Sequence, residues 1–382
     1  MFVPEGFLFS AVCCGIKKEN KPDLGLIYSS QKLSAWGVFT TNIVKAVPVI
    51  ISKRHLKEKE IYGVIVNSGI ANACTGEEGF KRAQIILKEI AKKLNIPYKS
   101  LLPASTGVIG TQLPIEKILP LIDTLIANLS PYNYLQFAQA IMTTDTFPKV
   151  TFRKTAEDIV ILGIAKGAGM IAPNMATMLA FILTDAKVTK EYLKRLLPKI
   201  VEESFNCISI DGDTSTNDSV YILSTNLKEV KDWKNFEKNC LEVAKELAYL
   251  IVRDGEGSSK VIKIIVKGVR TKKIAKILAT SIANSPLVKT AFYGEDPNWG
   301  RIFCALGKSG IKFDPEKVEI YLNGIPWIIN LKPVKDENKI KEEMKKYEIE
   351  LLIKLKEGKL GCEVLTTDLT EEYIKINAHY RT

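Results

Sequence analysis

Residues 166–186, KGAGMIAPNMATMLAFILTDA, place a glycine-punctuated loop directly before a continuous apolar run. The run covers 178–183 and is bounded by Gly and Pro on one side and by Thr184 and Asp185 on the other. This pattern is typical of a short, fully buried strand, because such strands lack polar alternation and end at turn residues. Burying such a strand requires a sizeable core, and a chain of 382 residues is long enough to build one.

Thr177 stands where this loop meets the expected strand. If the peptide bond between Ala176 and Thr177 were cut, the threonine would carry a free α-amine beside its own hydroxyl. That pair is a nucleophile with a built-in general base. The alternative is a threonine that only caps or packs at the start of a strand. The local pattern leaves both interpretations open.

Histidine is scarce, since the chain contains only His55 and His379. His55 lies in the charged run KRHLKEKE, which predicts a solvated helix end, and His379 is three residues from the C-terminus. A Ser-His-Asp or Cys-His arrangement needs an imidazole that is fixed by packing and oriented by a third group. Neither position indicates such a setting, so an acyl-transfer mechanism would use an amine or a carboxylate as its base. The same scarcity argues against a histidine-rich zinc site.

Composition and charge restrict the class of protein. Hydrophobic residues make up 46% and charged residues 25% of the chain, which is typical of a globular protein. No apolar run approaches the ~20 residues of a membrane-spanning helix, and the N-terminus lacks a basic segment before its apolar stretch, so we expect a cytoplasmic location and no membrane partner. The seven cysteines, an odd number without CxxC spacing, indicate reduced thiols. The net charge of +11 is spread through mixed Lys/Glu runs, which argues against nucleic-acid binding.

Alternating strand and helix signals predict an α/β or α+β fold with helix-covered β-sheets. A strand is expected at 61–66, and hydrophobic periodicity predicts helices at 77–95, 115–129, 133–142, 188–202 and 232–252. Apolar residues alternate with Glu or Lys over 349–355, and a Glu357-Gly358 turn before LGCEVLTTDL predicts a β-hairpin. A second hairpin turn is expected at Asn323-Gly324.

Several segments resemble, in the expected order, those of the ornithine acetyltransferase family, also called glutamate N-acetyltransferase, of arginine biosynthesis. KGAGMIAPNMATML resembles the cleavage and nucleophile segment of that family. The other segments are VNSGIANACTG (66–76), PASTGVIG (103–110), MTTDTFPK (142–149), SIDGDTSTND (209–218), RDGEG (253–257), GEDPNWGRI (294–302) and INAHYRT (376–382). The resemblance therefore spans nearly the whole chain. One departure is Ile70, which stands where the usual NSGNANACTG of the family has Asn.

The resemblance implies a self-cleaving acyltransferase with an N-terminal-nucleophile-like fold. It implies a cut between Ala176 and Thr177 into fragments 1–176 and 177–382, which stay together and pair into a heterotetramer. Thr177 would take an acetyl group from N-acetylornithine and pass it to glutamate in a double-displacement cycle. No metal or resident cofactor is expected. Family members differ in whether acetyl-CoA is a second donor, and we favour the bifunctional form.

The resemblance also implies the residues of the site. Thr106 and Gly107 would form an oxyanion hole, although the residues alone indicate an ordinary turn in a small-residue loop. The substrate site would be lined by Thr143, Lys166, Thr177, Glu256, Asn377 and Thr382. Thr144 adjoins Thr143 and offers the same chemistry. The last two substrate residues belong to a C-terminal tail, which would normally fray.

Three polar features have competing interpretations. Lys166 can hold a substrate carboxylate, but a solvated loop lysine is the ordinary alternative. Glu256 is flanked by glycines, which suits contact with a ligand amine. SIDGDTSTND carries clustered oxygen ligands that can bind Ca²⁺ or Mg²⁺, yet it lacks the closing glutamate of an EF-hand, so we expect turn chemistry near the site. Those ligands are Asp211, Asp213, Asn217 and Asp218.

Two other functions are compatible with the sequence. An N-terminal-nucleophile aminopeptidase or amidase would form the same acyl-enzyme and use water as the acceptor. Acetyl transfer to glutamate without net hydrolysis distinguishes the transferase from it. A basic, non-enzymatic binding protein would instead run as one intact band in denaturing electrophoresis and would retain nucleic acid in a salt-sensitive manner.

Overall fold

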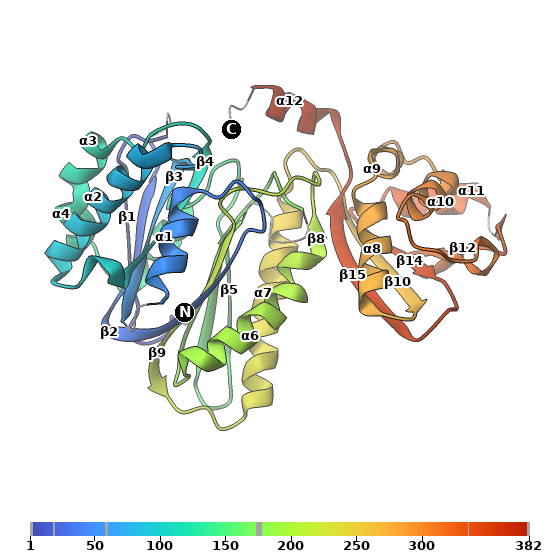
Figure 1. Ribbon diagram of the computed structural model, residues 1–382. Coiled ribbons are helices and arrows are strands. Elements are labelled where there is room, and N and C mark those ends of the chain that lie inside the picture. Colours follow the sequence, from blue (N-terminus) through green and yellow to red (C-terminus); the bar gives the residue numbers. More distant parts are fainter. Residues whose placement is uncertain (1–2, 18–19, 58–59, 173–177, 335, 380–382) are drawn as a thin grey trace.

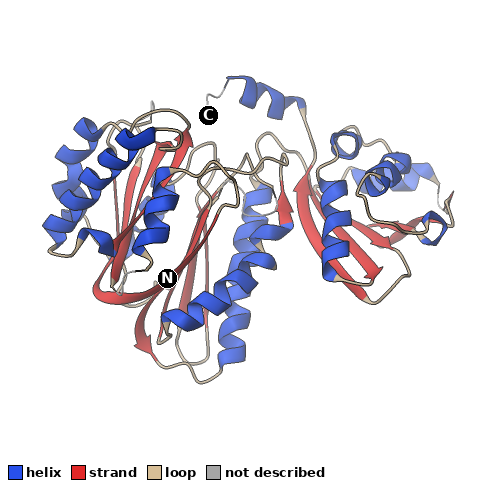
Figure 2. Ribbon diagram, viewed as in Figure 1, coloured by secondary structure: helices blue, strands red, loops and turns tan. Residues whose placement is uncertain are grey.

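The computed structural model describes residues 3–17, 20–57, 60–172, 178–334 and 336–379. Two β-sheets are covered by helices (Figures 1 and 2), which confirms the expected α/β class. The N-terminal-nucleophile part of that expectation depends on Ala176 and Thr177, which lie outside the described residues. Among the helices that the structure describes, none has the length and hydropathy to cross a bilayer.

The first sheet has eight strands in the order β4-β3-β2-β9-β7-β6-β5, with β1 added to β2. The long strand β2 joins its two halves, because it pairs with β3 over its first part and with β9 over its second. The strands are β1 (Leu8–Val12), β2 (Leu24–Phe39), β3 (Ile61–Ile70), β4 (Leu101–Val108), β5 (Lys149–Lys154), β6 (Val160–Lys166), β7 (Leu179–Ala186) and β9 (Ser219–Lys228).

Helices cover the outer faces of both halves (Figure 1). On the half formed by β5, β6, β7 and β9 lie α6 (Lys190–Glu202) and α7 (Trp233–Arg253). On the half formed by β1 to β4 lie α2 (Gly76–Leu94), α3 (Ile115–Ile118) and α4 (Ile122–Ala127). A third apolar cluster joins the inner faces of the two halves to α1 (Val47–His55) and α5 (Tyr134–Ala140).

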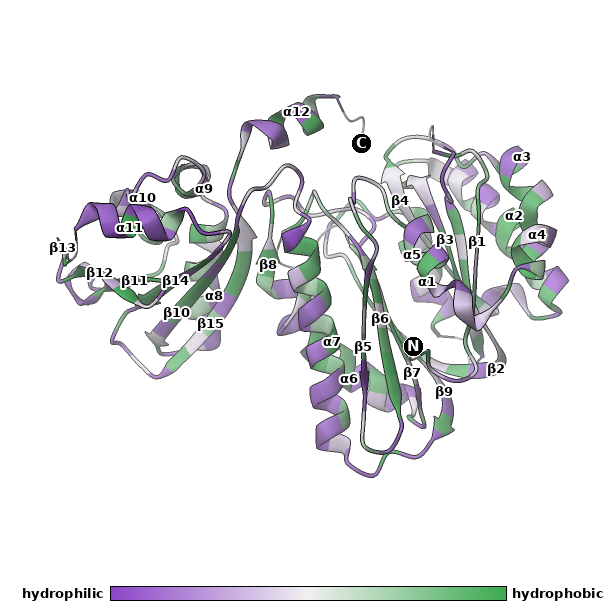
Figure 3. Ribbon diagram, turned by 180° about the vertical axis from the view of Figure 1, so that it is seen from behind, coloured by the Kyte–Doolittle hydropathy of each residue, from purple (hydrophilic) through white to green (hydrophobic). Residues whose placement is uncertain are grey.

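Strand β7 is buried along its whole length. Ala180 and Ile182 pack toward α6 and α7, whereas Leu183 and Phe181 pack into the inner cluster. The ring of Phe181 stacks on Tyr221, with 5.7 Å between the ring centroids. Because both faces are covered, the apolar run needs no polar alternation, and Figure 3 shows hydrophobic residues along β6 and β7. The predicted buried strand is confirmed.

The second sheet has the order β13-β12-β11-β14-β10-β15-β8. One of its faces builds a separate apolar core with α8 (Lys272–Ala283), α9 (Pro286–Tyr293), α10 (Trp299–Gly307) and α11 (Glu337–Met344). The strands are β8 (Ile208–Ser209), β10 (Val261–Val269), β11 (Glu319–Leu322), β12 (Ile325–Ile329), β13 (Lys332–Pro333), β14 (Glu348–Lys354) and β15 (Leu360–Thr367).

The prediction of a β-hairpin at the Glu357-Gly358 turn is wrong. β14 and β15 are not neighbours, because β10 lies between them, parallel to β14 and antiparallel to β15. The backbone N–H of Leu355 donates to the Lys267 carbonyl, so the connection crosses the end of β10. The Asn323-Gly324 hairpin is confirmed, since β11 and β12 pair and both turn residues have positive φ, 48° and 79°.

Four of the five expected helices are present as single elements, namely α2, α5, α6 and α7. The fifth, over 115–129, is divided into α3 and α4 by a 3-10 turn that contains Pro120. Proline lacks an N–H and clashes with the carbonyl of the preceding turn, so it interrupts the helix.

Residues 1–176 and 177–382 both contribute strands to the first sheet. β7 and β9, from the second range, lie between β2 and β6, from the first. The two ranges are therefore not separate folding units; they are only the fragments that the predicted cut would produce. A cut there would leave two interleaved fragments in one sheet.

Candidate active site

A cavity of about 190 Å³ brings together six of the predicted site residues. They come from β4, the loop after α5, the end of β6, the loop after α7 and helix α12 (Glu371–His379), which extends from the second sheet toward the first (Figure 1). Ala176, Thr177 and Thr382 lie outside the described residues. The six are Thr106, Gly107, Thr143, Lys166, Glu256 and Asn377.

Lys166 occupies the centre of this site. Its side chain is 3% exposed, so the interpretation as a solvated loop lysine is wrong. The Nζ ammonium donates to Thr143 Oγ1 at 2.8 Å and to Thr106 Oγ1 at 3.3 Å. Burial lowers the pKa of Lys166, and the nearby Asp145 carboxylate opposes that shift. The structure thus fixes a cationic group beside two hydroxyls, where it can attract a carboxylate.

Asp145 is the counter-charge that holds this arrangement in place. Its Oδ1 accepts from Lys149 Nζ at 2.7 Å, and the same ammonium donates to Asp254 Oδ2 at 2.6 Å. Lys166 Nζ lies 4.0 Å from Asp145 Oδ2. The backbone N–H of Gly167 also donates to Asp145 Oδ1 at 2.6 Å. MTTDTFPK is thereby joined to the segment of Lys166 through Gly167, and to the segment of Glu256 through Asp254.

The charges of this cluster are removed from water, with Lys149 and Asp145 side chains 0% exposed and Asp254 3% exposed. Burial alone would raise the pKa of Asp145. The positive charges of Lys166 and Lys149 and the hydrogen bonds from Lys149 and Gly167 outweigh burial and lower this pKa to about 2. Buried charges persist only where such partners compensate the loss of hydration.

The candidate oxyanion residues lie in strand β4 rather than in a loop. Gly107 pairs with Gly69 of β3, and the register shifts at Ile70. A Cβ on Gly107 would lie 2.2 Å from the Gly69 carbonyl carbon, and the φ of Gly107 is 128°, so glycine is required. Ile70 itself packs in an apolar cluster, while its carbonyl accepts from Asn67 Nδ2 at 2.8 Å. The departure from the family pattern therefore places an apolar side chain in the core.

Residues 371–379 form helix α12, so the described part of the C-terminal tail is ordered. The helix begins at the Thr370 hydroxyl, which accepts from the Tyr373 N–H at 3.2 Å and donates to the Gly257 carbonyl at 2.6 Å. Asn377 Nδ2 donates to Glu256 Oε2 at 2.9 Å. Side-chain contacts with the site thus supply the anchoring that a terminal segment usually lacks.

Two residues that line or support the site were not identified from the sequence. Tyr373 lines the cavity and donates from its hydroxyl to Asp211 Oδ2 at 3.4 Å. Burial raises the pKa of Tyr373, and the negative charges of Asp211 and Glu256 add to the shift. No sequence pattern indicated this tyrosine, because α12 has no buried face. For Asp145, the sequence does offer an indication, because its i,i+4 spacing to Lys149 within MTTDTFPK is compatible with an ion pair.

SIDGDTSTND lies at the site, as expected, and Asp211, Asp213 and Asn217 line the cavity. Asn217 Nδ2 donates to the carbonyls of Ala71 and Ser105 at 2.7 and 2.8 Å, which fastens the strand that carries Thr106. Within the described ranges, no group of three His, Cys, Asp or Glu side chains is arranged to hold a metal ion. GEDPNWGR follows α9 and forms the first turn of α10, beside the second core.

His55 is not solvated, in contrast to the expectation. Its side chain is buried, and Nδ1 lies 2.7 Å from the Leu101 carbonyl. The ring also packs edge-on against Tyr98, with 5.9 Å between the centroids. The described lining of the cavity contains no histidine, so the chemistry of the site rests on hydroxyl, amine and carboxylate groups.

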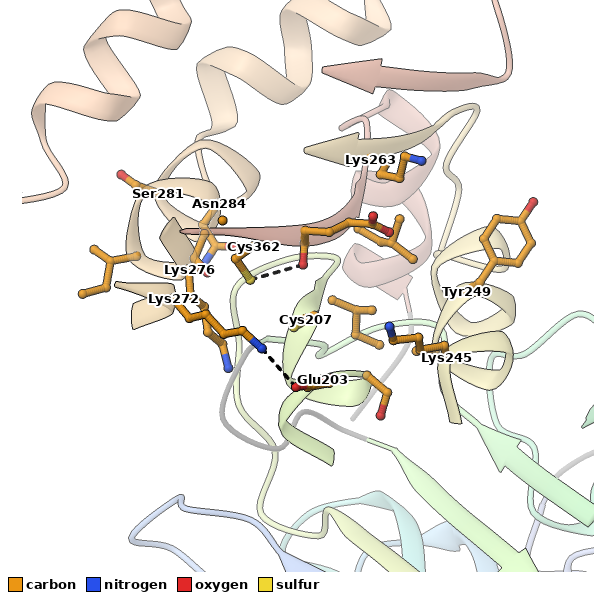
Figure 4. Close-up of a pocket in the computed structure, with 18 of the residues that line it drawn as sticks. Glu203, Cys207, Lys245, Tyr249, Lys263, Lys272, Lys276, Ser281, Asn284 and Cys362 are labelled. Carbon is orange, nitrogen blue, oxygen red and sulfur yellow. Dashed lines mark hydrogen bonds and ion pairs between the residues drawn. The ribbon is translucent and has the colours of Figure 1, made fainter. Parts of the chain in front are cut away.

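A second, larger cleft of about 1400 Å³ lies between α7, α8 and the uncovered face of the second sheet (Figure 4). Six lysines and five glutamates line it. Several are paired: Lys263 lies 2.8 Å from Glu350, and Lys272 lies 3.2 Å from Glu203. Since lysines and glutamates are nearly equal in number there, the cleft has no large net charge that would select an anionic or cationic ligand.

The fold and the small cavity define a mixed α/β protein with a polar site suited to a small charged molecule. The model of the ArgJ family matches residues 8–382, and the chain belongs to that family. A relative from Thermotoga neapolitana, named arginine biosynthesis bifunctional protein ArgJ, is 45% identical over 400 residues, covering 100% of both chains. A relative of the same name from Caldanaerobacter subterraneus subsp. tengcongensis is 43% identical, covering 100% of this chain and 98% of the relative.

Two solved structures are also similar. The arginine biosynthesis bifunctional protein argJ from Bacillus halodurans is 35% identical with a TM-score of 0.50, covering 52% of this chain and 98% of that chain. The ornithine acetyltransferase of Mycobacterium tuberculosis, solved in complex with ornithine, is 35% identical with a TM-score of 0.43, covering 44% of this chain and 92% of that chain. The resemblance inferred from the sequence segments is confirmed by the family match.

We expect Asp145→Asn to destabilise the fold by about 3–5 kcal/mol at neutral pH, because it removes a buried counter-charge from two lysines. The pKa of Asp145 is about 2 in the folded protein and 3.8 ordinarily, so its stabilising contribution is complete above about pH 4 and is lost as the pH falls toward 2. The difference from wild type should therefore shrink in acid. Chemical denaturation at neutral pH and near pH 3 measures both effects.

The control for this substitution is Asp123→Asn, which breaks an exposed ion pair with Lys93 at 2.6 Å. That change should alter the free energy of unfolding by less than about 0.5 kcal/mol. An effect at Asp145 no larger than this would show that the buried cluster does not hold the site together.

Proposed function

We propose that the protein is an acetyltransferase of arginine biosynthesis that moves an acetyl group from N-acetylornithine to glutamate and also accepts it from acetyl-CoA. The observation that carries this proposal is the pairing of opposite charges in one small cavity, with the Lys166 ammonium on one side and the Glu256 carboxylate on another. An α-amino acid presents the complementary carboxylate and amine. Both relatives are called arginine biosynthesis bifunctional protein, and this name supports the pathway and the second activity.

In the proposed activation, the Thr177 hydroxyl oxygen attacks the carbonyl carbon of Ala176. The peptide C–N bond breaks, the nitrogen takes a proton, and an ester joins Ala176 to the threonine oxygen. Water then hydrolyses the ester, leaving a carboxylate on Ala176 and a free hydroxyl and α-amine on Thr177. The amine is the general base for that hydroxyl in the transfer reaction.

Transfer then follows a double displacement. The Thr177 hydroxyl attacks the acetyl carbonyl of N-acetylornithine, its proton goes to the α-amine, and ornithine leaves as the C–N bond breaks. The amine of glutamate attacks the acetyl-threonine ester and restores the hydroxyl. Thr106 and Gly107 would stabilise the oxyanion of each tetrahedral intermediate. Lys166, which contacts Thr106 Oγ1 at 3.3 Å, adds positive charge beside that hydroxyl.

Two observations support the cut at residues 176–177. Leu179 at the start of β7 pairs with Lys166, so the chain that follows Thr177 enters the sheet beside the central lysine. In the Bacillus halodurans structure, 98% of the crystallised chain aligns with only 52% of this chain. The crystallised chain is therefore about half as long as this one, as a fragment of a cut protein would be. The interleaving of β7 and β9 with β2 and β6 would keep the two fragments together.

The remaining expectations belong to the same proposal. Two copies of each fragment would form a heterotetramer, and the enzyme would act in the cytoplasm without a resident cofactor. Assaying the purified protein with acetyl-CoA plus glutamate, and separately with N-acetylornithine plus glutamate, tests the two donors. Release of free acetate instead of N-acetylglutamate would indicate a hydrolase.

We expect the purified wild-type chain to run as two fragments, the second beginning at Thr177, and Thr177→Ala to abolish both cleavage and transfer. The substitution removes the attacking hydroxyl in both steps, whereas Thr177→Ser should retain part of each. Intact mass and N-terminal sequencing measure cleavage. Active enzyme that consists only of the uncut chain would refute the mechanism.

We expect Thr106→Ala to slow acetyl transfer roughly a hundredfold while the fold stays intact, because one oxyanion donor typically contributes about 3 kcal/mol. Steady-state kinetics and a melting curve measure the two effects. Thr124→Ala, at an exposed position in α4, is the matched control and should change neither. Normal turnover of the Thr106 variant would exclude Thr106 from the oxyanion hole and leave PASTGVIG with a structural role only.

We expect Gly169→Ala to raise KM for the amino-acid substrates about tenfold, because loss of a hydrogen bond to a charged group typically costs about 1.5 kcal/mol or more. A Cβ on Gly169 would lie 2.3 Å from Glu256 Oε2, so the carboxylate must move. The melting temperature should change little, since the displaced group ends a flexible side chain. Gly307→Ala, where a Cβ meets nothing within 4 Å, is the control, and equal KM values for the two variants would exclude a binding role for Glu256.

A further inference from the structure

The segment 209–219, which contains SIDGDTSTND, holds the main chain on the N-terminal side of residues 172–177. The Asp211 carboxylate accepts from the backbone N–H groups of Met170 and Ile171 at 2.5 and 2.9 Å. The N–H of Ile210 donates to the carbonyl of Ile171 at 2.7 Å. The Ser209 hydroxyl lies 3.3 Å from the same carbonyl. Hydrogen bonds from one segment therefore fix two consecutive residues just before this stretch.

The same segment also holds the C-terminal side. Asp218 Oδ1 accepts from the backbone N–H of Met178 at 3.0 Å. The N–H of Ser219 donates to the carbonyl of Met178 at 3.1 Å. The backbone N–H and the carbonyl of Met178 are thus both hydrogen-bonded to Asp218 and Ser219. The two anchors are carboxylates from one short loop.

The described contacts use only one oxygen of the Asp218 carboxyl. It is 0% exposed, and Oδ2 has no hydrogen-bond partner among the described residues. Thr40 faces this carboxyl, but its hydroxyl donates to the Ser215 carbonyl at 2.6 Å. Burial raises the pKa of Asp218 well above its ordinary value. An unpartnered buried oxygen lowers stability, so a purely structural anchor would favour a different side chain.

We propose that segment 209–219 is a clamp that fixes the main chain on both sides of the predicted Ala176–Thr177 bond, and that Asp218 is a positioning residue for cleavage of that bond. This inference rests on the proposed self-cleavage. An intramolecular attack depends on the placement of the attacking and attacked groups, and a displacement of about 1 Å can slow a reaction about 10²-fold. The clamp supplies no atom to the reaction; it sets the geometry in which the hydroxyl meets the carbonyl.

The test is a time course of cleavage after a pulse of cell-free synthesis, followed on denaturing gels as loss of the 382-residue chain. We expect Asp218→Ala to slow cleavage about 10²-fold, because it removes the acceptor for the Met178 N–H. Asp218→Asn keeps an oxygen acceptor of the same size and should recover most of the rate. Asp211→Ala, at a partly exposed position, should also slow cleavage and provides a second variant if Asp218→Ala does not fold.

Asp185→Ala is the matched control. Asp185 is also 0% exposed and also accepts a backbone N–H, from Val160 at 2.9 Å, but at the opposite end of β7. Its loss should lower the melting temperature while the cleavage rate stays within about twofold of wild type, because the two sites are distant. A merely structural role of Asp218 would make the two alanine variants behave alike.

The outcomes separate the clamp from the proposed function. If the wild-type chain is never cut, the proposed self-cleavage fails and the clamp fails with it. If the wild-type chain is cut and folded Asp218→Ala and Asp211→Ala are cut at the same rate, only the clamp is refuted. Slow cleavage in both variants, rescue by Asn and normal cleavage in the Asp185 variant would establish it.

Discussion

The buried ion pairs among Asp145, Lys149 and Asp254 hold the site together. Each charge has lost its hydration, so removing one partner leaves another uncompensated. The cluster joins the loop after α5 to the end of α7, and the Gly167 N–H adds the end of β6. The same electrostatic centre therefore fixes the backbone segments from which Lys166 and Glu256 project.

Local structure could be predicted where it depends on neighbouring residues. The apolar run after Thr177 predicted β7, and the periodicity of 77–95 predicted α2, since both patterns follow from burial of one or two faces. Pro120 divides the expected helix over 115–129, and a proline inside a helical pattern is itself a local signal for such a break. Among the described residues, six of the eight singled-out segments contribute to the cavity, and VNSGIANACTG and GEDPNWGRI do not.

The features that could not be predicted depend on contacts between distant parts of the chain. Alternation identified β14 and β15 as strands, but nothing in 348–367 indicates that β10 lies between them. The burial of Lys149 depends on Asp254, and the helix over 371–379 depends on side-chain contacts with Gly257 and Glu256. A single sequence shows which residues are polar, but it does not show which partners make their burial tolerable.

The interleaving of β7 and β9 between β2 and β6 imposes an order on assembly. A continuous chain forms this sheet by a unimolecular reaction, in which each loop closure costs only a few kcal/mol of entropy. Two separate fragments would have to find each other first, so their joining would depend on protein concentration and would compete with aggregation of exposed strands. Cleavage at the proposed bond would therefore have to follow folding. Once cut, the protein would refold after heating in a bimolecular reaction that slows on dilution, whereas refolding of the continuous chain would not depend on concentration.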